Sequence, residues 1–474
     1  MKREIINKLK SIVGKDQLTT APEELLCYSY DGTGREYQPE AVVFPVNTCE
    51  ITAIMQLANA TPFPVVPRGA GSGMTGGALP VAGGVVIALS RFNRILEIDE
   101  ANQVAVVEPG VITGDFRKTL EKRGLYYPPD PASLKFCTMG GNVAECAGGP
   151  SAVKYGVTRD YVLGLEVVLP DGRVIQTGVR TAKGVVGYDL TRLFIGSEGT
   201  LGIITKITVR LIPHPSAKKT FLILCNSIKQ ATSLVAEILT RHRPCTLEYM
   251  DRTAIQIVRE KLPFTLAENT QALLLLEVDG DAPSVAIQVD ALQEFLTAKR
   301  DLLSVMQAEK ADEIDALWAA RRAVSPAAFN LKPHKISEDV VVPRSRIPEL
   351  VFFVENLATK NALTIFTFGH AGDGNIHVNI MLDKNEPQEV NRAAIATKAL
   401  FEQVIKLGGT LSGEHGIGIT KAAYLPLELD AASLEVMRGI KKFFDPNNIL
   451  NPGKIFPAER HAKKTIDKIT DGRL

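Results

Sequence analysis

The sequence predicts an α+β protein built from more than one domain. Its 474 residues exceed what one ordinary core holds, so two or three domains are expected. Residues 41–213 alternate short apolar strands with glycine-rich turns and a single amphipathic helix at 49–60. From about residue 216 onward, longer strands and helices alternate, which favours an antiparallel sheet of ferredoxin-like type with helices on one side.

Composition excludes several classes of protein. Lys and Arg total 54 against 53 Asp and Glu, so a formal net charge of +1 gives no electrostatic case for binding nucleic acid. No segment approaches the roughly 20 consecutive apolar residues that span a bilayer. Residues 1–16 form an amphipathic helix pattern without the apolar core of a signal peptide, so the cytoplasm is the expected compartment. None of the six cysteines forms a CxxC pair, which disfavours an iron–sulfur cluster or a cysteine zinc site.

Three glycine-rich loops gather in the first domain. PRGAGSGMTGGALP, residues 67–80, follows a strand and presents backbone N–H groups suited to a pyrophosphate. It lacks the GxxxxGK[ST] pattern of nucleotide triphosphatases, and residues 80–89 read as a strand, so no Rossmann helix follows. Residues 128–160 and 195–205 supply the second and third loops. One such loop is often only a flexible turn, but three imply an extended ligand lying across the domain.

A histidine-bearing hairpin is the main signal of the second domain. In TIFTFGHAGDGNIHVNIM, residues 364–381, Asp373 and Gly374 are expected to form a two-residue type I′ turn. That turn would pair His370 directly with His377, with Cβ atoms about 4.5–5.5 Å apart. Two imidazoles so placed can share a divalent metal at about 2.0–2.1 Å from each nitrogen. Asn379 points to the same side.

A second motif, LSGEHGIG at residues 411–418, places Glu414 and His415 between glycines that allow sharp turns. His370, His377 and Glu414 then form a two-histidine, one-carboxylate metal site with open positions, and His415 is left as a base. The alternative is that these are cross-strand surface histidines with a chance acidic neighbour.

Together these motifs resemble the FAD-linked oxidase family with a vanillyl-alcohol-oxidase-type flavin domain. Within it they are most similar to the glycolate oxidase FAD-binding subunit and the D-lactate and D-2-hydroxyglutarate dehydrogenases. The resemblance implies a two-part PCMH-type FAD-binding domain, a ferredoxin-like antiparallel-sheet substrate domain and a C-terminal helical segment that returns to the flavin. The expected segments are an N-terminal helix and arm at 1–37, the FAD-binding domain at 38–215, the substrate domain with the metal-binding hairpin at 216–410, a segment at 411–457 that completes the active site and flavin pocket, and a tail at 458–474.

The resemblance also implies which residues hold a non-covalent FAD. In the first loop they are Arg68, Gly69, Ala70, Gly71, Ser72, Gly73, Thr75 and Gly76. In the second they are Pro129, Asp130, Ser133, Thr138, Gly140, Gly141, Asn142, Gly148, Gly149, Tyr155, Gly156 and Val157. Further along the chain they are Glu198, Gly199, Gly202, Ile204 and Asn451. One departure is Cys146, where close relatives usually have Asn.

The activity implied is FAD- and metal-dependent oxidation of a small D-2-hydroxy acid, D-lactate or glycolate, to the 2-oxo acid. Arg321 matches the arginine whose planar fork grips the substrate carboxylate, and Asn379 joins the catalytic set. A metal on His370, His377 and Glu414 would polarise the hydroxyl, His415 would accept its proton, and hydride would pass to flavin N5. Imidazole and carboxylate ligands suit Zn, Mn and Fe alike.

Two other functions remain compatible with the sequence. The chain could be a non-catalytic FAD electron-transfer subunit of a larger complex, or a metal-independent flavin oxidase whose histidines act directly as bases. The electron acceptor expected for a dehydrogenase is a quinone or a partner: an iron–sulfur subunit, an electron-transferring flavoprotein or a cytochrome. A homodimer, and peripheral attachment to a membrane through such a partner, are also compatible.

Overall fold

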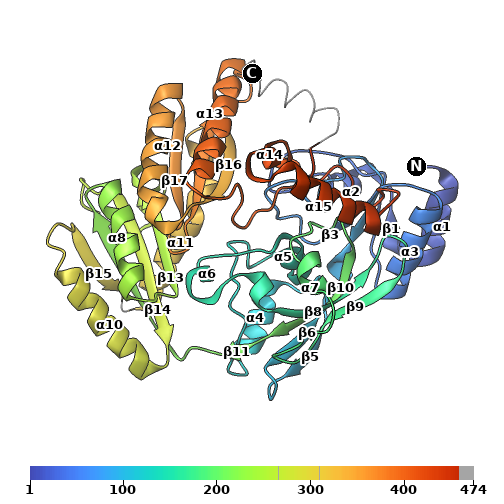
Figure 1. Ribbon diagram of the computed structural model, residues 1–474, viewed down its shortest axis with the longest axis horizontal. Coiled ribbons are helices and arrows are strands. Elements are labelled where there is room, and N and C mark those ends of the chain that lie inside the picture. The colour runs from blue at the N-terminus through green and yellow to red at the C-terminus, as the bar shows by residue number, and fades with distance from the viewer. Residues whose placement is uncertain (265, 309, 458–474) are drawn as a thin grey trace.

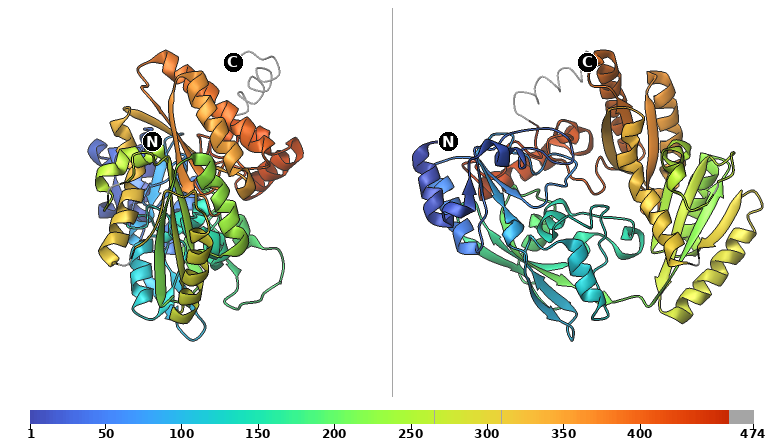
Figure 2. Two further views of the ribbon diagram at one scale, coloured as in Figure 1. Left: turned by 90° about the vertical axis from the view of Figure 1, so that its left-hand side faces the viewer. Right: turned by 180° about the vertical axis from the view of Figure 1, so that it is seen from behind.

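The computed structural model describes residues 1–264, 266–308 and 310–457, so the predicted tail at 458–474 lies outside the described residues. The chain forms two lobes that lie side by side (Figure 1). The first domain holds the N-terminal half of the chain and also the last helix, whereas the second domain is built from the middle of the sequence (Figures 1 and 2). Within the described ranges, no helix is both long and apolar enough to cross a membrane.

The first domain begins with a four-stranded sheet, in the order β1-β2-β4-β3. Its strands are β1 (Leu18–Thr19), β2 (Ala41–Val43), β3 (Val65–Arg68) and β4 (Val85–Ala88), and its helices are α1 (Arg3–Val13), α2 (Pro22–Leu26) and α3 (Thr48–Ala60). Helix α1 buries Ile5, Leu9 and Val13, which recur at the four-residue spacing of one helix face. Because β1 pairs with β2, the predicted N-terminal arm contributes a strand to this domain.

A five-stranded antiparallel sheet, in the order β5-β6-β10-β8-β9, forms the other part of the first domain. These strands are β5 (Ile95–Asp99), β6 (Val104–Val107), β8 (Val162–Val168), β9 (Val174–Gly178) and β10 (Ile203–Arg210). The helices of this part are α4 (Thr113–Glu121), α5 (Met139–Glu145), α6 (Ala152–Tyr155) and α7 (Leu190–Phe194), and β7 (Leu125–Tyr126) pairs with β11 (Ile212–Pro213). As predicted, residues 69–84, all of them described, contain no Rossmann helix.

The second domain is one seven-stranded antiparallel sheet, in the order β15-β12-β14-β13-β17-β18-β16. Its strands are β12 (Ala217–Cys225), β13 (Thr246–Asp251), β14 (Ala272–Gly280), β15 (Ser304–Ala308), β16 (His334–Val341), β17 (Thr364–His370) and β18 (Asn375–Leu382). The main helices are α8 (Ile228–Arg241), α10 (Ala282–Thr297), α12 (Ile347–Asn361) and α13 (Pro387–Lys406). The order shows two ferredoxin-like units, β12 to β15 and β16 to α13, joined where β13 pairs with β17.

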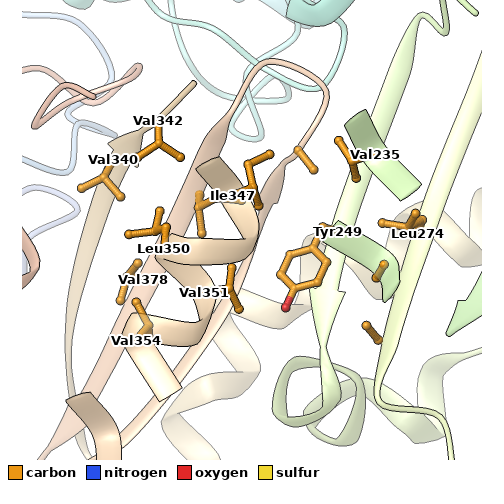
Figure 3. Close-up of a cluster of buried hydrophobic side chains, with 14 of the residues drawn as sticks. Val235, Tyr249, Leu274, Val340, Val342, Ile347, Leu350, Val351, Val354 and Val378 are labelled. Carbon is orange, nitrogen blue, oxygen red and sulfur yellow. The ribbon is translucent and has the colours of Figure 1, made fainter. Parts of the chain in front are cut away.

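Helices cover both faces of this sheet, so the prediction of helices on one side was wrong. Leu274 and Leu276 of β14 face the core under α8, α10, α12 and α13, part of which Figure 3 shows. Leu273 and Leu275 face a second core under α9 (Arg252–Val258) and α11 (Ala311–Ala327). The run of consecutive leucines in this strand is the pattern of a strand buried on both faces.

The β17–β18 hairpin has a different register from the one predicted. His370 pairs with Asn375, and Phe368 pairs with His377, because the loop comprises the four residues 371–374 and not Asp373 and Gly374 alone. The direct pairing of the two histidines was therefore wrong. Since the register differs by two residues, which is the repeat of a strand, both histidines still lie on one face of the sheet.

The C-terminal segment leaves the second domain and returns to the first. Helix α14 (Leu425–Glu428) still packs against α13 of the second domain, whereas α15 (Ala431–Phe444) lies over the first domain (Figure 1). Beyond α15, Leu450 forms a parallel bridge with Val65 of β3, and the Val65 N–H donates to the carbonyl of Ile449. Ile449 and Leu450 are buried in the core that α1 and α3 share. The first domain is thus completed by the end of the chain, as the resemblance implied.

Candidate active site

A cavity of about 850 Å³ lies between the two domains. Its wall on the first domain includes these residues predicted to hold FAD: Arg68, Gly69, Ala70, Gly71, Ser72, Gly73, Asp130, Ser133, Thr138, Gly140, Gly141, Asn142, Glu198, Gly199, Gly202 and Ile204. Its wall on the second domain and the loop after α13 includes Arg321, His370, His377, Glu414 and His415. The three glycine-rich loops and the histidine cluster therefore share one space.

The other residues predicted to hold FAD lie outside the cavity wall: Thr75, Gly76, Pro129, Gly148, Gly149, Tyr155, Gly156, Val157 and Asn451. Several of them support the site from behind. The Thr75 hydroxyl donates to the carbonyl of His415 at 3.0 Å, and the Asn451 amide donates to the carbonyl of Glu198 at 2.7 Å. The hydroxyl of Tyr155 contacts Asp279 of the second domain, so this side chain joins the two domains.

The first two glycine-rich loops fit an extended ligand because they pack closely against the rest of the domain. A Cβ on Gly69 would lie 2.4 Å from the Thr138 hydroxyl, and one on Gly140 would lie 2.4 Å from the Cβ of Pro109. Thr138 also caps α5 by accepting the N–H of Gly141 at 3.3 Å. The backbone of both loops therefore forms the cavity wall, an arrangement suited to the pyrophosphate of a dinucleotide.

Three imidazoles converge on one carboxylate oxygen at the other end of the cavity. Glu414 Oε1 lies 3.3 Å from His370 Nε2, 3.8 Å from His377 Nε2 and 4.0 Å from His415 Nε2. Ligand atoms that share an ion at about 2.0–2.2 Å are separated by roughly 3–4 Å, so this donor set fits a divalent metal. His370 and His377 are only 5% and 7% exposed, which overturns the alternative of surface histidines.

His370 is oriented by Glu248, a residue that sequence reasoning missed. Its Nδ1 lies 2.6 Å from Glu248 Oε1, so the Nδ1 proton points at that carboxylate and Nε2 is left to face Glu414. Burial lowers the pKa of His370, but the negative charges of Glu248 and Glu414 raise that pKa well above its usual value. Burial and the charge of His370 hold the pKa of His377 well below its usual value. The only signal for Glu248 was a carboxylate between the apolar residues Leu247 and Tyr249 of a buried strand.

Asp339 of β16 is the second residue that sequence reasoning missed. It is fully buried, and its Oδ2 accepts the N–H groups of Gly413, Glu414 and His415 at 2.9, 2.9 and 3.0 Å. Its Oδ1 accepts the side-chain amide of Asn375 at 2.6 Å. Burial raises the pKa of Asp339, but the charges of nearby cationic side chains and the N–H donors hold that pKa well below its usual range.

Asp339 also belongs to a group of potential metal ligands, together with His377, Glu414 and His415, whose ligand atoms lie within 4.8 Å of one another. Both Asp339 oxygens already accept hydrogen bonds, whereas His370 Nε2 faces Glu414 with its other nitrogen occupied by Glu248. His370 lies outside that group, and the hydrogen bonds of Asp339 show that it orients the backbone of residues 413–415.

Arg321 lies beside this cluster on α11. Its Nη2 is 2.5 Å from Glu248 Oε2, and its guanidinium carbon lies 4.5 Å from the centre of the Phe368 ring. Its Nε and Nη2 are buried and make no hydrogen bond of good geometry with any described residue. Asn379 does not line the cavity, since its amide oxygen accepts the Ser337 hydroxyl at 3.0 Å and its nitrogen lies 3.4 Å from the His377 carbonyl.

Lys335 and Ser325 form a polar pair at the end of α11, and the cavity wall reaches Ser325. The Lys335 ammonium donates to the Ser325 hydroxyl at 2.6 Å. Burial lowers the pKa of Lys335 to about 8. The Lys335 amine therefore lies behind the cavity wall at Ser325.

The fold and the cavity define a two-domain flavoprotein oxidoreductase. Two family models match the chain: "FAD binding domain" over residues 39–178, and "FAD linked oxidases, C-terminal domain" over residues 214–455. The chain belongs to the FAD-linked oxidase family. This result confirms the predicted family and supports FAD as its cofactor.

The most similar curated relatives include enzymes of hydroxy acids. Glycolate oxidase subunit GlcD of Bacillus subtilis is 43% identical over 469 residues, which cover 98% of this chain and 99% of that protein. D-lactate dehydrogenase of Anaerostipes hadrus is 37% identical, covering 88% and 90% of the two chains. D-2-hydroxyglutarate dehydrogenase of Stutzerimonas stutzeri is 32% identical, covering 96% and 99%. The relatives support FAD-linked oxidation of a hydroxy acid.

Solved structures show the same fold at low sequence identity. p-Cresol methylhydroxylase with substrate bound has a TM-score of 0.79 and 18% identity, covering 95% of this chain and 96% of that chain. 4-Ethylphenol oxidase from Gulosibacter chungangensis has a TM-score of 0.77 and 20% identity, covering 97% and 98%. These similarities confirm the predicted α+β fold class with its PCMH-type flavin domain.

Proposed function

We propose that the protein is an FAD- and metal-dependent dehydrogenase that oxidises a small D-2-hydroxy acid, D-lactate or glycolate, to the 2-oxo acid. One observation carries the proposal: the Nε2 atoms of His370, His377 and His415 converge on Glu414 Oε1 in the cavity that the flavin loops also line. The names of the relatives, glycolate oxidase subunit and D-lactate dehydrogenase, support this choice of substrates.

The residues that would hold the metal are His370, His377 and Glu414, and the loops of the first domain would hold FAD. When bound, FAD supplies hydride acceptance and the metal supplies Lewis-acid polarisation of the substrate hydroxyl. Arg321, whose Nη2 is paired with Glu248 and whose Nε has no hydrogen-bond partner among the described residues, binds the substrate carboxylate and so fixes the orientation of the substrate. His415 Nε2 faces Glu414 and accepts the hydroxyl proton.

Asp339 stabilises the charge that His415 gains in this step. His415 Nδ1 lies 4.0 Å from Asp339 Oδ2, on the side of the ring opposite to the proton-accepting Nε2. The buried carboxylate therefore sets a negative charge behind the ring. The arrangement thus pairs a base that faces the cavity with an anion behind it.

Anaerobic spectroscopy of the flavin tests the proposal. The purified yellow protein is mixed with D-lactate, L-lactate and glycolate before and after a chelator removes divalent metal, and again after Zn²⁺, Mn²⁺ or Fe²⁺ is added back. We expect bleaching by D-lactate or glycolate, loss of bleaching after chelation and recovery with metal. Bleaching that survives complete metal removal would instead identify a metal-independent flavin oxidase, whose peroxide release in air is measurable.

A non-catalytic electron-transfer subunit is the second candidate, and it predicts no bleaching by any hydroxy acid. The buried cluster of His370, His377, Glu414 and His415 favours the catalytic role, since such a cluster has no use in a scaffold. The word "subunit" in the name of the Bacillus subtilis relative supports passage of electrons to a partner chain or quinone. Reoxidation of the bleached flavin by a quinone analogue, compared with air, tests that step.

A further inference from the structure

Two buried carboxylates, one from each domain, hold the loop that carries Glu414 and His415. We call residues 413–418 the acid–base loop. Its first three N–H groups, those of residues 413–415, donate to Asp339 Oδ2 of the second domain. Its last two, those of Ile417 and Gly418, each donate at 2.7 Å to the carboxylate of Glu198 in the first domain. Only Gly416, at the bend between them, donates to neither.

The bend at residue 416 requires glycine, and it brings the loop close to Glu198. Gly416 has a φ of +81°, in the left-handed region that favours glycine. A Cβ at this position would lie 3.0 Å from Glu198 Oε1 and 2.4 Å from Oε2 of Glu145. The Gly416 carbonyl accepts the Ser412 hydroxyl at 2.8 Å. The loop is thus folded tightly between its two carboxylate acceptors.

Glu198 also belongs to the third glycine-rich loop, on the flavin side of the cavity. It lines the cavity, it adopts a strained φ of +52°, and its carbonyl accepts the side-chain amide of Asn451. One residue therefore forms part of the flavin wall and fixes the end of the acid–base loop. Thr75, behind the first glycine-rich loop, adds a second link by donating to the His415 carbonyl at 3.0 Å.

We propose that Asp339 and Glu198 are positioning residues that aim Glu414 and His415 into the cavity and couple metal binding in the second domain to flavin binding in the first. This inference rests on the proposed function for its metal. Asp339 orients the Glu414 and His415 side chains by accepting the N–H groups of three consecutive residues, 413–415. Glu198 connects the third glycine-rich loop to the N–H groups of Ile417 and Gly418. Metal and FAD therefore stabilise each other's binding, and that coupling is reciprocal.

The test uses Asp339→Asn and Glu198→Gln in the FAD-loaded protein. Two carboxylate-to-amide controls, Asp251→Asn and Asp445→Asn, remove buried acceptors of backbone N–H groups elsewhere in the second and first domains. Metal affinity is measured by competition with a chelator, and amide hydrogen exchange is followed in peptides that cover residues 411–421. The rate of FAD release is compared between metal-loaded and metal-stripped protein.

We expect both site variants to lose metal affinity by about tenfold or more and to exchange the loop amides at least tenfold faster, and we expect Asp339→Asn to keep FAD. In the wild type, metal should slow FAD release severalfold. In Glu198→Gln, the ratio of the release rate without metal to the rate with metal should fall to about one. The controls should match the wild type in all three measurements. Loop exchange and metal affinity within twofold of wild type in both site variants would overturn the inference.

Two further outcomes stay decisive. If the wild type binds no metal, the metal part of the proposed function fails, and loop exchange alone decides whether the two carboxylates position the loop. If Asp339→Asn does not fold, Thr75→Val removes one contact of the same loop, and it should weaken metal binding severalfold. Unchanged metal binding and loop exchange in Thr75→Val, together with an unchanged FAD-release ratio in Glu198→Gln, would again overturn the inference.

Discussion

His370 Nδ1 lies 2.6 Å from Glu248 Oε1, although 122 residues separate them in the sequence. Glu248 lies in β13, which pairs with β17 next to His370 through the Tyr249–Gly369 pair. The other Glu248 oxygen is 2.5 Å from Arg321 Nη2. One carboxylate therefore contacts both His370, a proposed metal ligand, and the arginine proposed to hold the substrate.

Replacing Glu248 with Gln should weaken metal binding. The amide can present its NH₂ group to His370 Nδ1, which selects the wrong tautomer, and partners of this kind contribute about 10- to 100-fold to metal affinity. Chelator competition measures the loss while flavin absorbance confirms bound FAD. Glu277→Gln is the control, because Glu277 is a buried carboxylate of the adjacent strand whose hydrogen-bond partners in the described residues are Lys218, Thr220 and Trp318. Equal metal affinity in both variants would contradict the orienting role.

His415→Asn should remove the proton acceptor. Flavin reduction by D-lactate or glycolate should slow by about 10²- to 10⁴-fold, the usual contribution of a general base. FAD and metal content should stay at wild-type levels. Stopped-flow absorbance under nitrogen measures the rate, with His242→Asn at the end of α8 as the control. Fast reduction by His415→Asn would show that another group takes the proton.

Arg321→Lys keeps the charge but loses the planar fork. Charge-assisted hydrogen bonds contribute about 1.5–3 kcal/mol each, so kcat/KM for the hydroxy acid should fall by roughly 10- to 150-fold, mainly through KM. Steady-state kinetics with an artificial acceptor measure this change. Arg322→Lys, the next residue on the helix and exposed, should stay within twofold of wild type. An unchanged KM in Arg321→Lys would show that Arg321 does not bind the carboxylate.

Gly148→Ala should displace Glu414 without touching any histidine. The added Cβ would lie 2.8 Å from Glu414 Oε2 and 3.3 Å from its Cβ, so the carboxylate must move. We expect metal affinity to fall at least severalfold while FAD stays bound. Gly439→Ala in α15 is the control, since an added Cβ there meets no described atom within 4 Å. Elemental analysis after dialysis checks the metal content, and full retention in Gly148→Ala would place Glu414 outside the metal site.

Asp251 should make stability depend on pH in a defined window. Burial raises its pKa from 3.8 to about 6, against the N–H donors of Ala254 and Thr367. Between these values the folded state binds more protons than the unfolded state, so stability falls as pH rises from about 4 to 6. A shift of this size corresponds to roughly 2–3 kcal/mol.

Asp251→Asn removes that titration. The difference in the free energy of unfolding, variant minus wild type, should therefore increase from pH 4.5 to pH 7, because only the wild type loses stability over that range. Urea unfolding followed by tryptophan and flavin fluorescence at the two pH values measures the difference. A constant difference across this window would show that the buried Asp251 carboxyl has an ordinary pKa.

The sequence could predict those parts of the site that lie within short motifs. The glycine-rich loops, the shared face of His370 and His377, and the adjacent Glu414 and His415 all follow from local spacing and turn chemistry. The fold class followed from the strand and helix patterns and from the order of the family motifs. The family match then confirmed that order over both domains.

The residues that orient the site could not be predicted in this way. Glu248 and Asp339 reach the cluster only through the pairing of strands distant in sequence, β13 with β17 and β16 with β18. The predicted register of the β17–β18 hairpin was wrong for a different reason. Its loop, residues 371–374, has two more residues than the Asp-Gly pair indicates. The prediction that helices cover only one side of the second-domain sheet was wrong because an apolar run is compatible with burial on one face or on both.

The bridge between Leu450 and Val65 has a consequence for biosynthesis. A ribosome makes the chain from its N-terminus, and domains generally fold as they emerge. Here β3, in the four-stranded sheet of the first domain, gains its Leu450 partner only after 385 further residues have been translated, counted from 65 to 450. The first domain can therefore finish folding only after the whole second domain has been translated.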